Sequence, residues 1–421
     1  MILGSTHTFW RRAINLFTAA LNLSEPWKVE KVDFRPAEGG KLELHIDIGF
    51  TEGGRFSCPV DGCGETATAY DTSERTWRHL NFFQYKTFIH ARQPRVKCGE
   101  HGVKTVEVPW ARPGSGFTLL FEGWCLELAK HVPVSVIAEM VDEHDTRLWR
   151  FIRHYVEEAR SHENYSETTA IGIDETSKKG HNYITVAVDL KEKKVIFVVN
   201  GKDSSTVNAF ADDFVLHGGD AGRIGIVTCD MSLGFRKGIR ERFQNAKMII
   251  DKFHVIKHAN EAVDSTRKAE TKTNAALKKT KYIWLKNEKN LTDSQKEKKE
   301  SLMKLHLKTG RALMMREELQ DIYESAGSRE TAEARMNALC SWIMHSRISE
   351  MKPFAKLIKN HFDEILNYFD CQYTNAILEG MNSIIQNIKR RARGFRNTEF
   401  FKTMIYLVCG KLPLEKYAVM P

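Results

Sequence analysis

Alternating and helical spacings of hydrophobic residues divide the first part of the chain into a β-rich stretch and a helical one. Residues 8–22 carry apolar side chains on one helical face, which predicts an amphipathic helix. Segments 28–35 and 41–50 alternate apolar and polar residues around a Glu38-Gly39-Gly40 turn, which predicts two strands. The period then becomes helical in three pieces, at 119–130, 134–143 and 146–158. We therefore expect a small β module followed by three helices.

The central region holds three short apolar runs, and each stops on an aspartate. These residues are Asp174, Asp230 and Asp251. Brief β-branched runs predict buried strands of a parallel or mixed sheet, where polar residues at neighbouring strand ends converge on one crevice. Three carboxylates there would repel one another without a cation, which predicts a Mg²⁺ site. The alternative, that each aspartate only caps the following helix, stays open.

Further elements of this region extend the pattern. Alternation predicts strands at 183–189 and 195–200, and Asp203 is expected to begin a helix. With the three apolar runs, these segments give the order β-β-β-α-β-α-β-α. This is the order of an RNase H-like fold, in which the first and fourth strands are adjacent and bring Asp174 and Asp230 together. The same elements could also be connected in a different sheet topology.

Polar, lysine-rich helical sequence separates this region from the end of the chain. Residues from 255 to about 340 are expected to form an all-helical insertion, with a capping box at Thr292 and Gln295. Trp284 is expected in its core, in preference to a role in stacking on a base. The predicted fold class is therefore a multidomain α+β and α/β protein with a helical insertion.

The segment 374–391 predicts a helix with two unlike faces. The apolar face holds Ile377, Met381, Ile384, Ile385 and Ile388. The polar face runs from one acid through amides to arginines, with Glu379, Asn382, Ser383, Gln386, Arg390 and Arg393. This gradient favours a metal at the acid and DNA phosphates along the basic end, contacted by Lys389, Arg390, Arg391 and Arg393. The alternative is an ordinary solvated face.

The composition of the chain indicates which binding partners it favours. The chain has 421 residues, and its 63 Lys and Arg exceed its 54 Asp and Glu by nine, so the surface favours a polyanion such as nucleic acid. No stretch approaches the roughly 20 apolar residues that a membrane helix needs, so we expect a cytoplasmic protein without a membrane partner. Eight cysteines spread over this length argue against a disulfide framework and for metal binding or burial.

Two close pairs of metal-ligand residues lie within the expected β module. Cys58 and Cys63 form the first pair, and Cys98 and His101 the second. Sulfur and imidazole ligands on two glycine-containing turns are typical of a closed, structural zinc site. His79 and His90 lie between the pairs as rival ligands, and the alternative is that the cysteines are ordinary turn thiols.

The three helical pieces after the β module suit a helix-turn-helix. The third piece carries Arg147, Arg150 and Arg153, which would enter the major groove, with Trp149 and Ile152 facing inward. The alternative is an amphipathic helical linker.

Four motifs together resemble the bacterial DDE transposases of the ISL-three type. They are Gly172-Ile173-Asp174-Glu175, Cys229-Asp230-Met231-Ser232, Asp251-Lys252-Phe253-His254-Val255, and the segment from Asn375 to Lys389 with the Arg-Arg-Ala-Arg-Gly-Phe-Arg-Asn that follows. The zinc module and helix-turn-helix precede them in the same order. One departure is the zinc module, where relatives usually show two Cys-x-x-Cys pairs.

The resemblance implies an RNase H-like domain with Asp174, Asp230 and Glu379 as an acidic triad, and with Asp251 and His254 as auxiliary residues. It implies two Mg²⁺ ions, with Mn²⁺ as a substitute, beside the structural zinc. Water would expose a 3′-hydroxyl at the element end, and that hydroxyl would attack target DNA. The expected partners are double-stranded terminal inverted repeats and target DNA, bound at the nucleoid by a homodimer or larger assembly.

The expected organisation follows from these segments. The β module with the N-terminal helix occupies 1–112, the helix-turn-helix 113–165, the catalytic core 166–258 and 346–421, and the helical insertion 259–345. Two other classes stay open, a related nuclease or resolvase that joins no strands and a non-catalytic DNA-binding regulator.

Overall fold

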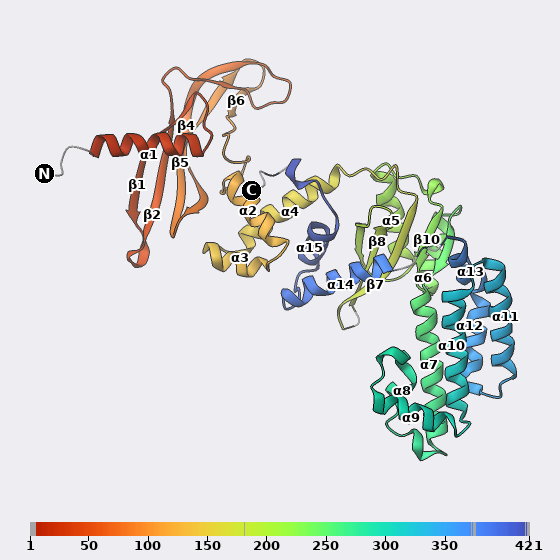
Figure 1. Cartoon of the computed structure of the whole chain (residues 1–421). Coiled ribbons are helices and arrows are strands. Elements are labelled where there is room, and N and C mark those ends of the chain that lie inside the picture. The colour runs from red at the N-terminus through yellow and green to blue at the C-terminus, as the bar shows by residue number, and fades with distance from the viewer. Residues whose placement is uncertain (1–5, 181, 372, 374–375, 417, 419–421) are drawn as a thin grey trace. The chain divides into compact units, whose positions relative to one another are not determined.

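The computed structural model describes residues 6–180, 182–371, 373, 376–416 and 418 (Figure 1). The chain divides into two compact units, Met1–Ser161 with Leu412–Pro421, and His162–Lys411. Thr374 and Asn375, at the start of the last motif, lie outside the described residues. None of the helices in the described part of the chain is long and apolar enough to cross a membrane.

The first unit is built on a six-stranded sheet. Its strands are β1 (Trp27–Pro36), β2 (Leu42–Phe50), β3 (Arg55–Ser57), β4 (Thr66–Phe82), β5 (Tyr85–Cys98) and β6 (Gly102–Thr105). They lie in the order β1-β2-β5-β4-β3, with β6 paired to β5. The predicted hairpin of β1 and β2 is antiparallel, and β4 and β5 form a second, longer antiparallel ribbon.

Aromatic side chains fill the core of this sheet. Trp110 packs edge-to-face on Trp27 and Trp77, with ring centroids 4.9 and 5.5 Å apart. Helix α1 (Thr6–Ala20) packs the partly buried Ile14 and Phe17 against the same core. Because such aromatic pairs bury large apolar areas, the β module has a hydrophobic core of its own.

Three helices follow the sheet, as the spacing predicts. They are α2 (Leu119–Ala129), α3 (Val134–Val141) and α4 (Asp145–Ser161). Trp149 and Ile152 are buried, which confirms the predicted inward face of α4. A fully buried carboxylate of α2 joins these helices, because Glu122 accepts hydrogen bonds from three donors. They are Arg112 Nε at 2.9 Å, Ser115 Oγ at 2.6 Å and Tyr155 Oη at 2.7 Å.

The second unit is built on a mixed five-stranded sheet in the order β11-β10-β7-β8-β9. The strands are β7 (Ala170–Lys179), β8 (Asn182–Asp189), β9 (Lys194–Asn200), β10 (Ile226–Cys229) and β11 (Lys247–Ile250). Strands β7, β8 and β9 form an antiparallel meander, whereas β10 is parallel to both β7 and β11. The predicted order of strands and helices is confirmed, and the first and fourth strands are neighbours.

One strand boundary differs from the prediction. Asp174 was expected to end its strand, but β7 continues to Lys179 because it stays paired with β8. The parallel pairing of β7 with β10 stops at Gly172. Asp174 therefore lies just beyond the parallel part of the sheet, even though it lies inside a strand.

Helices cover the two faces of this sheet. Helices α5 (Ser204–Leu216) and α6 (Leu233–Arg242) pack Phe210, Phe214 and Phe235 into a core with Ile171 and Ile173 of β7. Helices α14 (Ala376–Arg391) and α15 (Thr398–Cys409) come from the end of the chain and contact β7 and β9 respectively. Side chains alternate along a strand, so Gly172 and Asp174 point away from the face that holds Ile171 and Ile173.

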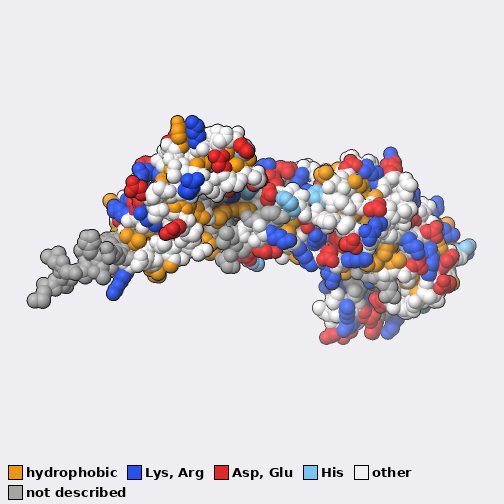
Figure 2. Space-filling model, turned by 90° about the horizontal axis from the view of Figure 1, so that it is seen from above, with side chains coloured by type: hydrophobic (Ala, Val, Ile, Leu, Met, Phe, Trp, Pro, Cys, Tyr) orange, Lys and Arg blue, Asp and Glu red, His pale blue; other side chains and the backbone are white. Residues whose placement is uncertain are grey.

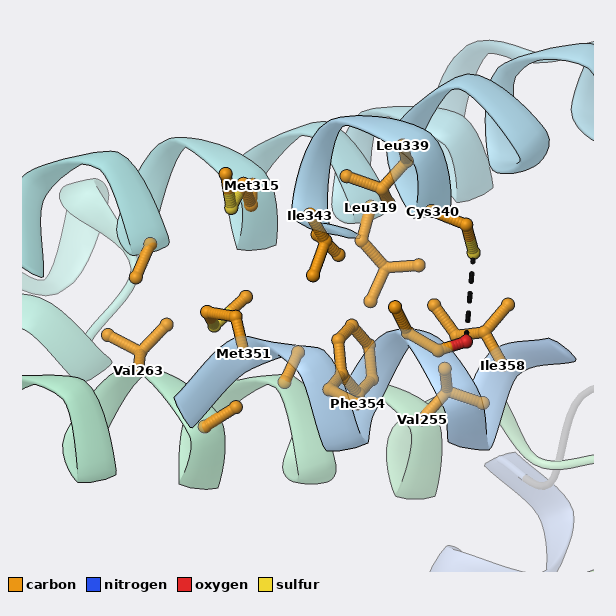
Figure 3. Packing of buried hydrophobic residues seen from close by; sticks show 14 of the residues in the cluster. Val255, Val263, Met315, Leu319, Leu339, Cys340, Ile343, Met351, Phe354 and Ile358 are labelled. Atoms are coloured by element: carbon orange, nitrogen blue, oxygen red, sulfur yellow. Dashed lines mark hydrogen bonds between the residues drawn. The ribbon is translucent and has the colours of Figure 1, made fainter. Parts of the chain in front are cut away.

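A helical region continues from β11. Its helices are α7 (Lys252–Thr271), α8 (Lys281–Leu285), α9 (Asp293–Met303), α10 (Lys308–Ser325), α11 (Arg329–His345), α12 (Lys352–Asn360) and α13 (Phe362–Cys371). Figure 3 shows Val255 and Val263 of α7 facing side chains of α10, α11 and α12 across one apolar core. The capping box at Thr292 and Gln295 is confirmed, and Trp284 is fully buried.

This helical core extends further than the expected insertion. It includes Phe354 and Ile358 of α12 and Leu366 of α13, all beyond residue 345. Helix α13 in turn packs on β11 of the sheet. The first helix, α7, begins directly after β11, so one continuous helix joins the sheet edge to the helical core.

Basic and acidic side chains are mixed on one face of the molecule (Figure 2). On the face seen in Figure 2, Lys and Arg side chains are interspersed with Asp and Glu and do not gather in one patch. A basic path for DNA therefore has to be sought in particular residues.

Candidate functional site

The contact between β7 and α14 brings the last helix to the sheet. A Cβ atom on Gly172 would lie 2.7 Å from Leu378 Cδ1, so a larger residue at this position would have to displace the side chain of Leu378. Further along, Asn382 Nδ2 donates to Asp174 Oδ2 at 2.7 Å, and Gln386 donates to Thr176 at 2.7 Å. Alternate residues of β7 thus contact residues of α14 that are four apart, and this pairing fixes the register between the strand and the helix.

This register explains one error in the predicted faces of the helix. Ile384 was expected on the apolar face, but it is 41% exposed, whereas Leu378, Ile385 and Ile388 are buried. The stripe that contains Leu378, Asn382 and Gln386 faces the strand, so Ile384 falls on the side away from it.

An open hollow of about 680 Å³ lies where β7, β10, α7 and α14 meet. Its lining includes all the acidic and auxiliary residues singled out from the sequence, namely Asp174, Asp230, Asp251, His254 and Glu379, together with Asn382. We refer to it as the acidic pocket. Glu379 lies in the first turn of α14 and is exposed, so its carboxylate is open to solvent at the rim.

Each aspartate of the acidic pocket also accepts a hydrogen bond from a nearby backbone N–H group. Asp230 Oδ1 accepts from Ser232 N at 2.8 Å, and Asp174 Oδ1 accepts from Glu175 N at 2.8 Å. Asp251 caps α7 by accepting from Phe253 N at 3.1 Å, and its other oxygen lies 3.1 Å from His254 Nδ1. The capping interpretation therefore holds for Asp251, whose second oxygen is engaged as well.

The electrostatics of the acidic pocket favour a bound cation. The pKa of Asp174 is raised to about 6, mainly because the carboxylate is buried and to a lesser extent because the carboxylates of Asp230 and Asp251 lie nearby. Burial also raises the pKa of Glu379, with a second contribution from Asp251. The hydrogen bond to Asp251 raises the pKa of His254. Partly desolvated carboxylate oxygens that raise one another's pKa are the donor set that a hard divalent ion relieves.

The predicted zinc ligands form a much tighter group. One ligand atom each from Cys58, Cys63, Cys98 and His101 lies within 4.8 Å of the others. Within the described residues, the carboxylates of the acidic pocket do not form such a group. Three sulfurs and one imidazole are the ligands of a closed tetrahedral zinc site, so this donor set fits a structural zinc ion.

Local turns hold the zinc ligands in place. His101 N donates to Cys98 Sγ at 3.4 Å, and Glu65 accepts from Gly99 N at 2.8 Å on the same turn. The rival histidines lie elsewhere, since His79 contacts Thr118 Oγ1 at 2.8 Å and His90 contacts His45 at 2.7 Å. The ligand set is therefore the one expected from the two close pairs.

The arginines of α4 differ in their surroundings. Arg147 stacks on Phe117, with 4.4 Å from the guanidinium to the ring centroid, and pairs with Glu143. Arg153 pairs with Glu157 at 2.6 Å, and Arg150 is exposed. All three lie on the solvent side of the helix.

The basic end of α14 is only partly available to a ligand. Lys389 Nζ donates to Ser177 O at 2.7 Å, so this residue supports the contact with β7. Arg390 donates to Asn387 at 2.9 Å. Arg390, Arg391 and Arg393 are exposed.

Sequence reasoning placed Asn382 on the polar face of the last helix without giving it a role. Its signal was its spacing, because it lies three residues after Glu379 and therefore on the same side of the helix.

The described structure combines a module with a zinc-ligand group, a segment of three helices and a mixed sheet with an acidic pocket. The family model of the ISL3 transposases, described as a transposase, matches residues 171–405. Models for the helix-turn-helix domain of transposase family ISL3 and for the zinc-finger of transposases IS204, IS1001, IS1096 and IS1165 match residues 106–156 and 55–101. The chain belongs to the ISL3 family of transposases.

Curated relatives agree with this assignment. The transposase for insertion sequence element IS1557 of Mycobacterium tuberculosis is 27% identical over 92% of this chain and 94% of its own length. The transposase for insertion sequence element IS1001 of Bordetella parapertussis is 25% identical over 79% of this chain and 84% of its own length.

Proposed function

We propose that this transposase cleaves and joins DNA strands in the acidic pocket, with Asp174, Asp230 and Glu379 as its catalytic triad. The region from 166 to 258, completed by 346–421, would be an RNase H-like catalytic core interrupted by the helical insertion 259–345, whose apolar core also takes in residues of α12 and α13. The supporting observation is that carboxylates from β7, β10 and α14 line one open hollow, although Glu379 is far from the others in sequence.

The donor set fits Mg²⁺, with Mn²⁺ as a substitute, because these ions take carboxylate oxygens. Bound there, such ions would activate an attacking oxygen and stabilise a leaving one at a phosphodiester. Asp174 would hold both ions, and Asp230 and Glu379 would each complete the ligands of one ion. Asp251 and His254 would serve as auxiliary residues, since their direct contacts are with each other and with the start of α7.

The chain's own residues would position Asp174 for this role. Asn382 donates to one oxygen of Asp174 and Glu175 N to the other, so the carboxylate is oriented before DNA binds. A pre-oriented carboxylate needs less reorganisation during the reaction.

DNA recognition would fall to the first unit. The helix-turn-helix, expected at 113–165, would read the terminal inverted repeats through Arg147, Arg150 and Arg153, and the zinc module at 1–112 would support it. Arg390, Arg391 and Arg393, with Lys389, would lie along phosphates near the acidic pocket. Because both ends of an element must be held together for joined insertion, two or more copies of the chain would assemble on DNA.

The direct test begins with the DNA around the gene. Paired inverted repeats on either side would supply the substrate, and purified protein would be given labelled repeat ends and plasmid target with Mg²⁺. We expect cleavage at the repeat boundary followed by covalent joining to the plasmid. Cleavage without joining would favour a nuclease, and binding without cleavage would refute the catalytic proposal.

A further inference from the structure

A second, smaller hollow lies beside the acidic pocket and shares two residues with it. Its volume is about 240 Å³, and it lies between α7 and α8. Phe253 and Lys257 line both hollows. Its other lining residues are Ile256, Asn260, Glu261, Asp264, Lys281 and Leu285. Both carboxylates are paired, Glu261 with His258 and Asp264 with Arg267. We refer to it as the side hollow.

One wall of the side hollow is formed by α7. Phe253, Ile256, Lys257 and Asn260 follow one another at helical spacing, so they form one stripe along the first turns of α7. The opposite face of that helix is anchored in the apolar core through Val255, seen in Figure 3, and Ala259; both are fully buried. These residues of α7 therefore run along one helix from the acidic pocket to the side hollow.

The chemistry of the side hollow combines apolar and polar features. Phe253 is 55% exposed, although it is a large apolar residue at the rim of a charged pocket. Ile256 and Leu285 supply further apolar surface, and Lys257 and Lys281 are exposed cations. Asn260 Oδ1 is buried and has no hydrogen-bond partner in the described part of the chain. Buried polar atoms are nearly always paired, so this oxygen is suited to a donor brought by a ligand.

We propose that the side hollow binds one unstacked DNA base next to the phosphate that is cleaved. A base has a flat face that can stack on Phe253, amino or imino hydrogens for Asn260 Oδ1, and phosphates on either side for Lys257 and Lys281. A volume of about 240 Å³ is below the range of pockets for drug-sized ligands, and it suits a single base. The proposal rests on the proposed function, because it requires a DNA strand whose phosphate lies at the carboxylates.

The test combines protein variants with altered DNA ends. Bases on both sides of the cleaved phosphate are removed one at a time, and cleavage rates are measured for the wild-type chain and for Phe253→Ala. On intact DNA, Phe253→Ala is expected to cleave about 10-fold more slowly, because it loses one base–aromatic stack. On DNA that lacks the bound base, wild type and variant should cleave at the same rate. Phe253→Tyr should keep most of the rate.

Two further variants complete the test. Asn260→Ala should reduce discrimination among the four bases at that same position. Tyr282→Ala is the matched control, because Tyr282 is a 63% exposed aromatic residue of α8 that lines neither hollow, and it should cleave like wild type.

The outcomes separate the two proposals. With Ca²⁺ in place of Mg²⁺, the affinities of wild type and Phe253→Ala for intact and abasic DNA are compared instead of their cleavage rates. This tests binding of the base even if strands are not cut. If the chain cleaves DNA but Phe253→Ala is slower than wild type by the same factor whichever base is removed, the side hollow holds no base. If the ends are neither bound nor cleaved, both proposals fail.

Discussion

The two candidate metal sites of this transposase are built in opposite ways. The zinc ligands Cys58, Cys63, Cys98 and His101 come from two tight turns and already lie within 4.8 Å of one another. The carboxylates of the acidic pocket come from β7, from the residues just after β10 and β11, and from α14, and they do not gather so closely in the described chain. A structural ion needs a closed set of ligands, whereas a catalytic ion needs room for substrate.

Hydrogen bonding sharpens the contrast. In the zinc site, backbone groups of the turn point at the ligands, as His101 N does toward Cys98 Sγ. In the acidic pocket, Asn382 donates to Asp174, and Ser232 N donates to Asp230. Burial of the carboxylate, with smaller contributions from the charges of Asp230 and Asp251, raises the pKa of Asp174. The zinc-ligand group therefore fits a structural role, whereas the acidic pocket keeps carboxylates partly desolvated beside one another.

The largest expected effect is on the stability of the first unit. Removing zinc with a chelator, or replacing a ligand by Cys98→Ser, should cost on the order of 10 kcal/mol of folding free energy. Tryptophan fluorescence during thermal unfolding would follow it, because Trp27, Trp77 and Trp110 lie in that core. Cys371→Ser is the control, since this thiol is partly exposed and lies outside the zinc site. An unchanged melting temperature after proven zinc loss would contradict a structural role.

The next effect is on catalysis. Asp174→Asn, Asp230→Asn and Glu379→Gln should each lower strand cleavage by about 10³-fold or more, because each loses a cation ligand worth several kcal/mol in the transition state. Binding to repeat ends should persist, as measured by gel shift.

The matched control for these variants is Glu175→Gln. Glu175 also lines the acidic pocket, but its carboxylate lies 3.5 Å from Lys202 Nζ. It should therefore lose far less activity than the three proposed ligands. Equal losses at all four positions would indicate a general effect of pocket charge, without specific ligands.

A smaller effect concerns pH in the absence of divalent ions. The pKa of Asp174 rises from 3.8 to about 6 on folding, so the folded chain holds this proton more tightly than the unfolded chain does. The resulting stabilisation is fully present below about pH 4 and is lost as pH rises through 6. In thermal unfolding, the stability of the wild-type chain should therefore fall as pH rises from 4 to above 6. Asp174→Asn should lack this part of the pH dependence. Added Mg²⁺ should offset the loss at high pH, and a contribution that rises with pH would show that the sign is wrong.

The smallest effect concerns DNA affinity, to which neither metal site contributes directly. Arg150→Ala should weaken end binding and reduce the slope of log affinity against log salt by about 0.9, the value for one phosphate contact. Arg147→Ala should also lower stability, because Arg147 packs on Phe117. Salt titrations of both variants would separate the two roles, and an unchanged slope in Arg150→Ala would remove Arg150 from the contacts.

The sequence was most informative where ligands are close along the chain. Cys58 with Cys63, and Cys98 with His101, could be paired by spacing alone, because each pair lies on one turn. The strands and helices of the central sheet were also predictable, since their periods are clear and their order is that of the chain. The zinc site and this order of elements therefore needed little tertiary information.

Other features depended on contacts that no local pattern carries. Asp174 lies within a strand because β8 continues to pair beyond it, and Ile384 is exposed because α14 turns another stripe toward β7. The bond from Asn382 to Asp174 joins residues 208 positions apart. Spacing left Asp251 and Glu379 as rivals, and only the family resemblance favoured Glu379.

Glu379 is therefore the residue on which the account depends most. The decisive measurement is cleavage of repeat ends by Glu379→Cys in Mg²⁺ and in Mn²⁺. Thiolate is a poor ligand for Mg²⁺ and a better one for Mn²⁺. If Glu379 binds the catalytic ion, cleavage should be lost in Mg²⁺ and restored in Mn²⁺, while Glu379→Ala stays inactive in both. Full activity of Glu379→Cys in Mg²⁺, or rescue of Glu379→Ala by Mn²⁺, would contradict the proposed triad.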